Sequence, residues 1–180
     1  MAAAEATTEP EWLDRAEKMA AFAYKVASKN GWRIPEYFDE NWEANHEAGK
    51  LLNDGRRYYE GYVTGHSMQL ARFALQVGAG LRSMGWDVPD YLLEMGTELF
   101  ERARVDGWRR TDACPGFSTG VDDEGDPIPG EDEHQQWVVC EGVCAAVAVR
   151  RAMLDDGARV SDVEHFEHCY RSFVDYIHDY

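Results

Sequence analysis

Five stretches of the sequence carry apolar residues at helical spacing, and the connections that join them alternate between long and short. A stretch of this kind buries its apolar face against neighbouring helices. Short breaks join the second stretch to the third and the fourth to the fifth, whereas long connections join the first to the second and the third to the fourth. The five stretches span residues 11–28, 66–84, 89–105, 133–154 and 161–180. The sequence therefore predicts an all-α fold of antiparallel helical hairpins.

The same alternation predicts which end of the bundle carries the functional groups. In antiparallel hairpins the short turns lie together at one end and the long connections at the other. The starts of the second and fourth stretches then share the long-connection end. Long connections inside a compact domain are commonly functional or disordered, and the aromatic content of the first one, residues 32–64, argues against disorder there. The side chains placed at this end are His66, His134, Gln136, Trp137 and Glu141.

The fourth stretch stands apart because its centre, residues 137–149, is apolar nearly all round. Such a helix is predicted to be enclosed on every side, and Cys140 and Cys144 within it are predicted to be buried free thiols. The second and fourth stretches would be inner helices and the other three outer ones. The first outer helix lacks an inner partner before it and the last lacks one after it, so the pattern favours part of a closed ring of hairpins.

Two local signals refine this arrangement. Within the connection between the third and fourth stretches, residues 116–121 and 126–128 flank the acidic turn at 122–125, which predicts a small β-hairpin in a long loop. At the fifth stretch, Ser161 and Glu164 have the spacing of a capping box, which predicts a helix start at Ser161.

Length and charge limit the class of protein. The chain of 180 residues is predicted to be a single domain, with residues 1–10 as a flexible leader. Its net charge of −16 argues against nucleic acid and anionic membranes as partners. The excess of Arg over Lys in so acidic a chain favours a halophilic protein over an ordinary acidic one. With neither a signal peptide nor a long apolar run, a cytoplasmic location is expected, and exposed inner faces would favour a homo-oligomer.

His66 is the residue whose type and position most favour acid/base chemistry. Imidazole titrates near neutrality, His66 lies where a long connection gives way to a helix, and Gln69 lies one turn later on the same face. Trp137 and Glu141 are also one turn apart. A ring beside a carboxylate suits a sugar, because a C–H face stacks on the ring while hydroxyls need acceptors. The alternatives are a locally hydrogen-bonded His66 and a Glu141 paired with a structural Arg.

No metal site is predicted. His165, His168 and Cys169 lie close together, but no fourth ligand stands at a suitable spacing. The acidic residues 122–124 lack the spacing of an EF-hand loop. The chain also lacks a Gly-rich phosphate loop and a GxSxG motif.

Several motifs occur in an order that is specific as a set. They are Tyr37-Phe38-Asp39-Glu40-Asn41-Trp42, Gly65-His66-Ser67, Leu99-Phe100-Glu101 with Gly107-Trp108, Gly116-Phe117 before Asp123-Glu124-Gly125, and Trp137-Val138-Val139-Cys140-Glu141. This order resembles the N-acylglucosamine 2-epimerase superfamily, and within it the mannose isomerase-like branch. The similarity runs from about residue 12 to the C-terminus. It implies an (α/α)6 barrel, of which this chain would form roughly the C-terminal half without the last helix or so.

The resemblance also implies a reaction and its residues. Family members interconvert aldoses and ketoses or epimerise C2 of a monosaccharide, by moving a proton through an enediolate-like state without a metal or other cofactor. His66 would be one of two catalytic histidines, with the other beyond Tyr180. Trp137 and Glu141 would contact the sugar, and Gln69 is the third predicted substrate contact.

The chain departs from the family pattern directly after the Gly-His motif. The family usually has Glu and Trp where this chain has Gln69 and Leu70, and Gln cannot act as a carboxylate partner for the histidine. A non-catalytic fragment, or a sugar-binding helical module of the same fold, is therefore the alternative to a sugar isomerase or epimerase. A glycoside hydrolase on the same barrel would need two positioned carboxylates, and Glu141 offers one.

Overall fold

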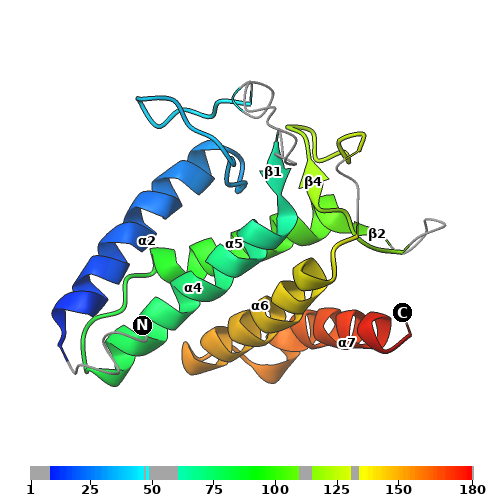
Figure 1. The fold of residues 1–180 in the computed structure, drawn as a ribbon. Coiled ribbons are helices and arrows are strands. Elements are labelled where there is room, and N and C mark those ends of the chain that lie inside the picture. The colour runs from blue at the N-terminus through cyan, green and yellow to red at the C-terminus, as the bar shows by residue number, and fades with distance from the viewer. Residues whose placement is uncertain (1–8, 47, 49–60, 110–114, 131–133, 180) are drawn as a thin grey trace.

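The computed structural model describes residues 9–46, 48, 61–109, 115–130 and 134–179. Within these residues it contains five α-helices, one 3-10 helix and four short strands (Figure 1). The helices are α2 (Glu11–Lys29), α4 (Thr64–Ser83), α5 (Tyr91–Gly107), α6 (Gln136–Asp155) and α7 (Glu164–Asp179), with the 3-10 helix η1 (Val160–Val163) before α7. All five predicted helices are present, with ends that differ by a few residues. The predicted start of the fourth helix at residue 133 lies outside the described residues, as do residues 1–8 of the leader predicted at residues 1–10.

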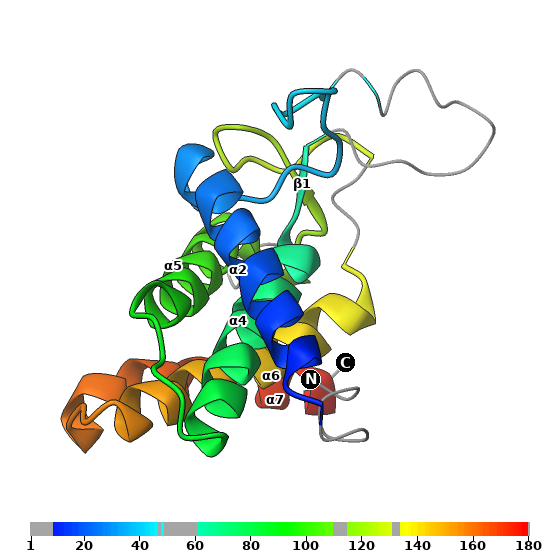
Figure 2. The same ribbon diagram turned by 90° about the vertical axis from the view of Figure 1, so that its left-hand side faces the viewer.

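Helices α4 and α6 lie at the centre of the arrangement. α4 packs against α2, α5 and α6, while α6 packs against α4, α5 and α7. The side chains of Met68, Leu99, Phe100, Val138 and Val149 are fully buried in the core, and each such burial contributes about 1.5–3 kcal/mol. Figure 2 shows α2 lying across α4 with α5 beside it. Central and flanking helices joined as antiparallel hairpins agree with the predicted partial (α/α)6 barrel.

The connections follow the predicted alternation. Figure 1 shows β1 and β4 beside the start of α4, at the end of the bundle reached by the long connections. The short breaks between α4 and α5 and between α6 and α7 lie at the other end of the helices. The starts of α4 and α6 therefore share one end, as the loop lengths predict.

Short strand pairs tie the two long connections together at that end. β1 (Tyr62–Val63) pairs antiparallel with β4 (Gly120–Val121), and β2 (Trp108–Arg109) pairs antiparallel with β3 (Gly116–Phe117). The predicted hairpin around residues 122–125 is present as a single bridge between Val121 and Pro127. Strand β4, the first arm of this hairpin, pairs mainly with β1. The β1–β4 pairing therefore joins the two long connections to each other. A strand of two residues carries no periodic signal, which is why the sequence did not reveal β1.

The prediction that α6 is enclosed on every side is wrong for the described structure. Cys140 and Cys144 are exposed, and Val147 keeps 47% of its surface accessible. These residues follow one another at helical spacing, so they form one stripe of α6. Among the described residues no helix covers that stripe, although the opposite face carries the buried Val138 and Val149.

The predicted capping box before α7 is also wrong in its residues. The 3-10 helix η1 begins at Val160, two residues before the carboxylate that caps it. Asp162 accepts hydrogen bonds from the backbone N–H of Arg159, at 3.1 Å, and from its guanidinium. The Arg159 side chain, followed by its backbone N–H, lowers the pKa of Asp162. The capping box lies two residues earlier than predicted because the 3-10 helix η1 precedes the α-helix.

Helix α2 ends in a cap formed by Asn30 and Gly31. The Asn30 side-chain amide donates to the carbonyl of Val26 at 2.8 Å, and Gly31 has a φ of 62°. Trp32 also adopts a positive φ of 64°, which is rare for a bulky residue. Its N–H donates to the carbonyl of Ala27 at 2.8 Å, and its ring packs edge-on against Tyr24. These contacts fix the direction in which the chain leaves α2.

In the part of the chain that the structure describes, no helix combines the length and the apolar character that a membrane crossing requires.

Candidate functional site

His66 lies in the first turn of α4, directly after β1. Thr64 fixes this start, because its N–H donates to the carbonyl of Thr119 at 3.0 Å and its hydroxyl donates to the carbonyl of Ser118 at 2.7 Å. Thr64 is almost fully buried. The residues around β4 thus hold the backbone just before His66, so the second long connection sets the place of the histidine.

Gly65 allows α6 to approach α4 closely beside His66. A Cβ on Gly65 would lie 2.5 Å from the Cη2 and Cζ3 atoms of Trp137. The Trp137 ring packs against the His66 imidazole, with centroids 5.3 Å apart and planes tilted by 39°. The indole N–H donates to the side-chain oxygen of Gln135 at 2.6 Å, which fixes the ring plane. The Gly-His pair therefore has a packing explanation: glycine makes room for the ring that contacts the histidine.

Glu36 is the carboxylate partner of His66. Its Oε1 lies 2.7 Å from Nδ1 of His66, and it comes from the connection between α2 and β1. The hydrogen bond that His66 donates to Glu36 raises the pKa of His66 above its ordinary value of 6.5, burial opposes this rise, and the negative charge of Glu36 adds to it. His66 keeps 43% of its side-chain surface accessible, compared with 17% for Glu36, so the imidazole is held on one side and open on another.

The segment that carries Glu36 is held against the strands. Pro35 forms a bridge with Tyr62 of β1, and the N–H of Glu36 donates to the carbonyl of Gly61 at 3.3 Å. Arg33 binds the buried carboxylate of Asp106 at the end of α5 through two hydrogen bonds of 2.7 and 3.1 Å. Strand β1 therefore positions both residues: the Glu36 segment is bonded to it, and His66 follows it closely in the chain.

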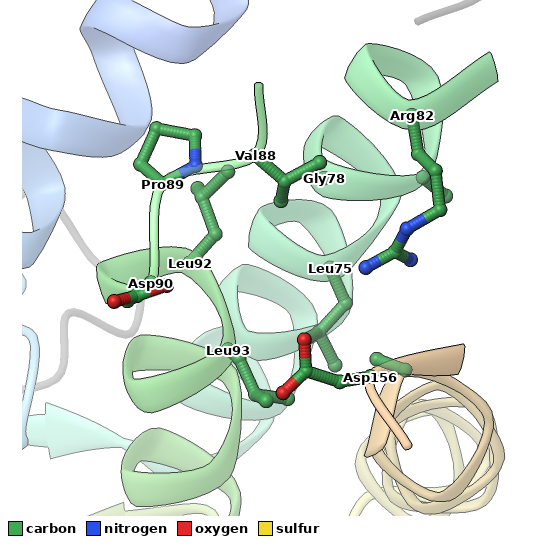
Figure 3. A pocket seen from close by; sticks show the side chains of 11 residues that line it. Leu75, Gly78, Arg82, Val88, Pro89, Asp90, Leu92, Leu93 and Asp156 are labelled. Atoms are coloured by element: carbon green, nitrogen blue, oxygen red, sulfur yellow. The ribbon is translucent and has the colours of Figure 1, made fainter. Parts of the chain in front are cut away.

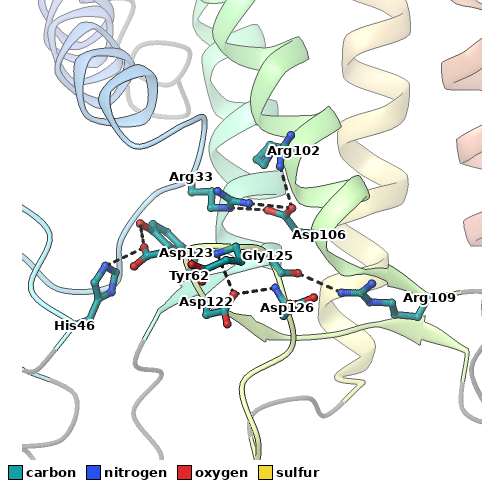
Figure 4. A network of polar contacts seen from close by, with 11 residues as sticks. Arg33, His46, Tyr62, Arg102, Asp106, Arg109, Asp122, Asp123, Gly125 and Asp126 are labelled. Carbon is teal, nitrogen blue, oxygen red and sulfur yellow. Dashed lines mark hydrogen bonds and ion pairs between the residues drawn. The ribbon is translucent and has the colours of Figure 1, made fainter.

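Figure 4 shows the polar network around this anchor. Arg33 and Arg102 converge on Asp106. The hydroxyl of Tyr62 donates to Asp123 at 2.8 Å, and burial, followed by that hydrogen bond, raises the pKa of Tyr62. The network connects the segment after α2, strand β1, α5 and the turn after β4 through side-chain contacts.

Glu141 lies one turn after Trp137 and is bound by α4. Arg72 donates to both of its carboxylate oxygens, at 2.9 to 3.2 Å, and Gln69 donates its side-chain amide at 3.1 Å. Arg72 and Glu141 have 21% and 18% of their side-chain surfaces accessible. The structure thus brings Gln69 and Glu141 together and gives Glu141 the arginine partner that the sequence left open.

The other two residues predicted at this end take different surroundings. Nδ1 of His134 lies 3.1 Å from the carbonyl of Pro115, and a Cβ on Gly116 would meet both His134 and the hydroxyl of Tyr176. His134 therefore lies on the side of α6 that faces β3 and α7. Gln136 is exposed at the start of α6.

Two cavities of the described structure lie away from His66. A cavity of about 120 Å³ lies between α4, α5 and α6 at the short-break end, with Arg82 and Asp156 at its edge (Figure 3). It is smaller than the roughly 300 Å³ at which ligand pockets usually begin. A groove of about 1200 Å³ runs between α2 and α4, and Lys18 is the one charged side chain in its described lining. Neither cavity offers an acid/base pair.

His165, one of the three candidate metal ligands on α7, contacts a carboxylate of a neighbouring helix. Nε2 of His165 lies 2.7 Å from Glu101 of α5 and 3.7 Å from the sulfur of Cys169. Burial raises the pKa of the Cys169 thiol to about 11. Among the residues that the structure describes, no three His, Cys, Asp or Glu side chains are grouped to hold a metal ion.

Comparison with known proteins places the chain in a family. The family model described as N-acylglucosamine 2-epimerase matches residues 1–180. The chain belongs to the N-acylglucosamine 2-epimerase family. The resemblance read from the five motifs is thereby confirmed.

Two curated relatives carry the same description. A protein described as D-mannose isomerase from Thermobifida fusca is 32% identical over 183 residues, which cover all of this chain and 41% of the relative. A second D-mannose isomerase, from Pseudomonas cannabina pv. alisalensis, is 30% identical over 151 residues, which cover 83% of this chain and 36% of the relative. This chain therefore spans about two fifths of the length of the curated relatives it matches.

A solved structure supports the fold. A crystal structure of D-mannose isomerase superposes with a TM-score of 0.77 at 19% sequence identity, covering 99% of this chain and 41% of that one. At this identity the likeness shows the fold, and it agrees with the antiparallel hairpin arrangement described above.

Sequence reasoning missed Glu36 and the pairing of Arg72. Arg72 continues the helix face of His66 and Gln69, and a buried Glu141 needs a partner. The sequence therefore held enough information to predict Arg72 as the partner of Glu141. Glu36 had no such signal. It stands in a non-periodic connection, and the chain has 34 acidic residues from which spacing alone cannot select one.

Proposed function

We propose that this chain carries the proton-transfer half of a sugar isomerase or 2-epimerase site, with His66 as the general acid/base. The observation that supports this proposal most is the surroundings of His66. The imidazole contacts Glu36 through Nδ1 and packs on Trp137, yet remains accessible. The family and the D-mannose isomerase description of the curated relatives supply the substrate class.

The geometry at His66 suits abstraction of a carbon-bound proton. A carboxylate accepts hydrogen bonds and donates none, so the proton between the two residues belongs to Nδ1 of neutral His66. Nε2 then carries the lone pair that acts as a base. A general base works best when its pKa lies near the operating pH, and Glu36 moves the pKa of His66 upward from 6.5.

The reaction would run on the open-chain sugar. Nε2 of His66 takes the proton from C2 of the aldose, and the electron pair of that C–H bond forms the C1–C2 double bond while the carbonyl oxygen at C1 becomes an enediolate oxygen. Transfer of the O2 hydroxyl proton to O1, together with return of the proton from Nε2 of His66 to C1, gives the ketose. Return of a proton to the opposite face of C2 gives the 2-epimer.

Trp137, Glu141 and Gln69 would hold the sugar. The Trp137 ring, with its plane fixed by Gln135, offers an apolar surface for the C–H face of a sugar. The Glu141 carboxylate accepts four hydrogen bonds from Arg72 and Gln69, two on each oxygen, which occupy its roughly four lone-pair positions. A sugar hydroxyl bound to Glu141 would therefore replace one of the longer of these contacts, such as the one from Gln69 at 3.1 Å.

Deuterium incorporation tests this proposal directly. The 180-residue chain is incubated with mannose, glucose or fructose in D2O, and label at C2 of the aldose or C1 of the ketose is followed by NMR. Exchange needs one base and solvent, so it reports His66 without requiring net conversion. Label in at least one sugar supports the proposal, and the absence of label in every sugar overturns it.

A sugar-binding module without catalysis is the second candidate. It is favoured by Gln69, which stands where the family usually has Glu, and by the engagement of Glu141 with Arg72. Calorimetric titration with the same sugars separates the two functions. Heat of binding without deuterium exchange supports the binding module, and exchange excludes it.

A further inference from the structure

We infer that Glu36 is the positioning residue of the proposed reaction and fixes the tautomer and orientation of the His66 imidazole. This inference rests on the proposed function, in which His66 is the base. It also assigns a role to a residue outside the Gly-His motif, on a different segment of the chain.

Distance and accessibility support this assignment. The 2.7 Å separation of Oε1 and Nδ1 is that of a short, charge-assisted hydrogen bond. Glu36 is the more buried of the two side chains, so water competes for its carboxylate less than for the imidazole. One ring nitrogen is thereby committed to the protein, and the other is left for a substrate.

The other groups around His66 do not supply this partner. Gln69, one turn along α4, donates to Glu141, and Arg72 also binds Glu141. The positive charge of Arg72 and the negative charge of Glu141 therefore compensate each other, and neither residue is the partner of the imidazole. Trp137 on α6 presents an uncharged ring. Among the described residues, Glu36 is the carboxylate in contact with His66.

The position in α4 makes such a partner necessary. His66 lies in the first turn, where the positive end of the helix dipole disfavours imidazolium. Burial disfavours it as well. Both effects weaken His66 as a base, and the Glu36 hydrogen bond opposes both.

The Glu36 backbone is held firmly enough to position a ring. Its N–H donates to Gly61, the preceding Pro35 bridges Tyr62, and Arg33 is bound to Asp106. A side chain held by its own rigid segment can fix a neighbour within the narrow range that proton transfer needs.

NMR titration of the imidazole in the 180-residue chain tests the inference without any sugar. His66 signals are assigned by their loss in His66→Asn and are followed against pH in four proteins. These are the wild type, Glu36→Gln, which removes the charge, Glu36→Ala, which removes the acceptor, and Glu40→Gln, which makes the same charge change on an exposed side chain of the same connection.

The expected results differ for each variant. In the wild type and Glu40→Gln, the His66 pKa lies above 6.5 and the nitrogen shifts report a proton on Nδ1. In Glu36→Gln the pKa moves down, and in Glu36→Ala the proton moves from Nδ1 toward Nε2. A His66 pKa and tautomer that are the same in all four proteins would overturn the inference.

The outcome is separable from that of the proposed function. A wild-type chain that labels no sugar contradicts the proposed reaction, while the titration still decides whether Glu36 controls the ring. If sugars are labelled, Glu36→Gln should shift the acidic limb of the exchange pH profile to lower pH together with the His66 pKa. A limb that stays in place contradicts the positioning role.

Discussion

The Trp137 ring occupies the space that a side chain at Gly65 would need. Its Cη2 and Cζ3 atoms lie 2.5 Å from the position of a Cβ on residue 65. The contact joins the first turn of α4 to the first turn of α6 and brings the ring against His66. The two helices can approach this closely at the candidate site because residue 65 has no side chain.

Gly65→Ala should destabilise the chain and displace Trp137. Forcing a methyl group into this contact costs about 1–3 kcal/mol, which corresponds to a loss of about 2–4 °C in Tm per kcal/mol for a chain of this size. Thermal melts and tryptophan fluorescence measure the two effects. Gly78→Ala is the matched control in the same helix, because its Cβ would meet nothing closer than 3.4 Å. Equal stability of Gly65→Ala and the control would contradict the packing account.

Arg72 and Glu141 should be energetically coupled. Removal of Arg72 leaves the largely buried carboxylate of Glu141 with Gln69 as its remaining donor, so Arg72→Met is expected to cost about 1–3 kcal/mol. Adding Glu141→Gln to Arg72→Met removes the unpaired negative charge and should recover part of the lost stability. A double-mutant cycle by urea denaturation should give a coupling of about 0.5–3 kcal/mol. Additive effects of the two substitutions would show that the pair contributes no coupling.

The stabilising effect of Glu36 should depend on pH. A folded-state pKa of His66 above its ordinary value means that the pair contributes stability below about pH 6.5 and that this contribution is lost as pH rises through the folded pKa. Glu36→Gln should therefore lower Tm more at about pH 5.5 than at about pH 8.5. Melts of Glu40→Gln at the same two pH values provide the control. A larger loss for Glu36→Gln at the higher pH would have the wrong sign.

The cysteines should react in a fixed order. Cys140 and Cys144 are exposed, whereas burial raises the pKa of Cys169 to about 11. Because the thiolate is the reactive form, iodoacetamide at about pH 8 should modify the two α6 thiols well before Cys169. Cys114 lies outside the described residues, so the experiment uses a Cys114→Ser variant in which three thiols remain. Mass spectrometry then follows the order in which they are alkylated, and urea should make all three reactive. Early labelling of Cys169 in the folded chain would contradict its buried state.

Much of the fold follows from the sequence because it depends on local signals. Apolar spacing reveals the helices, and the loop lengths reveal that the starts of α4 and α6 share one end. The strands, in contrast, depend on pairing between residues far apart, such as Tyr62 with Val121. The exposure of Cys140 and Val147 was missed because composition predicts which side chains are apolar but not whether a neighbour covers them.

The candidate site was predictable in part for the same reason. His66, Trp137 and Glu141 lie at the starts of helices, where helix polarity and loop length assign them to one end. The role of Gly65 requires knowing how closely α6 approaches α4. Glu36 is positioned by a bridge to β1 and by the ion pair of Arg33 with Asp106, and none of these contacts has a signature in spacing.

The most direct test of the account is the rate of deuterium exchange at C2 in three proteins. The wild type, His66→Asn and His168→Asn are compared with the same sugar in D2O; His168 is an exposed residue of α7 and makes the matched control. General acid/base groups contribute about 100- to 10,000-fold to rate, so His66→Asn should lower the exchange rate by about 100-fold or more, while His168→Asn should keep the wild-type rate. Wild-type exchange in His66→Asn would contradict the assignment of His66 as the base.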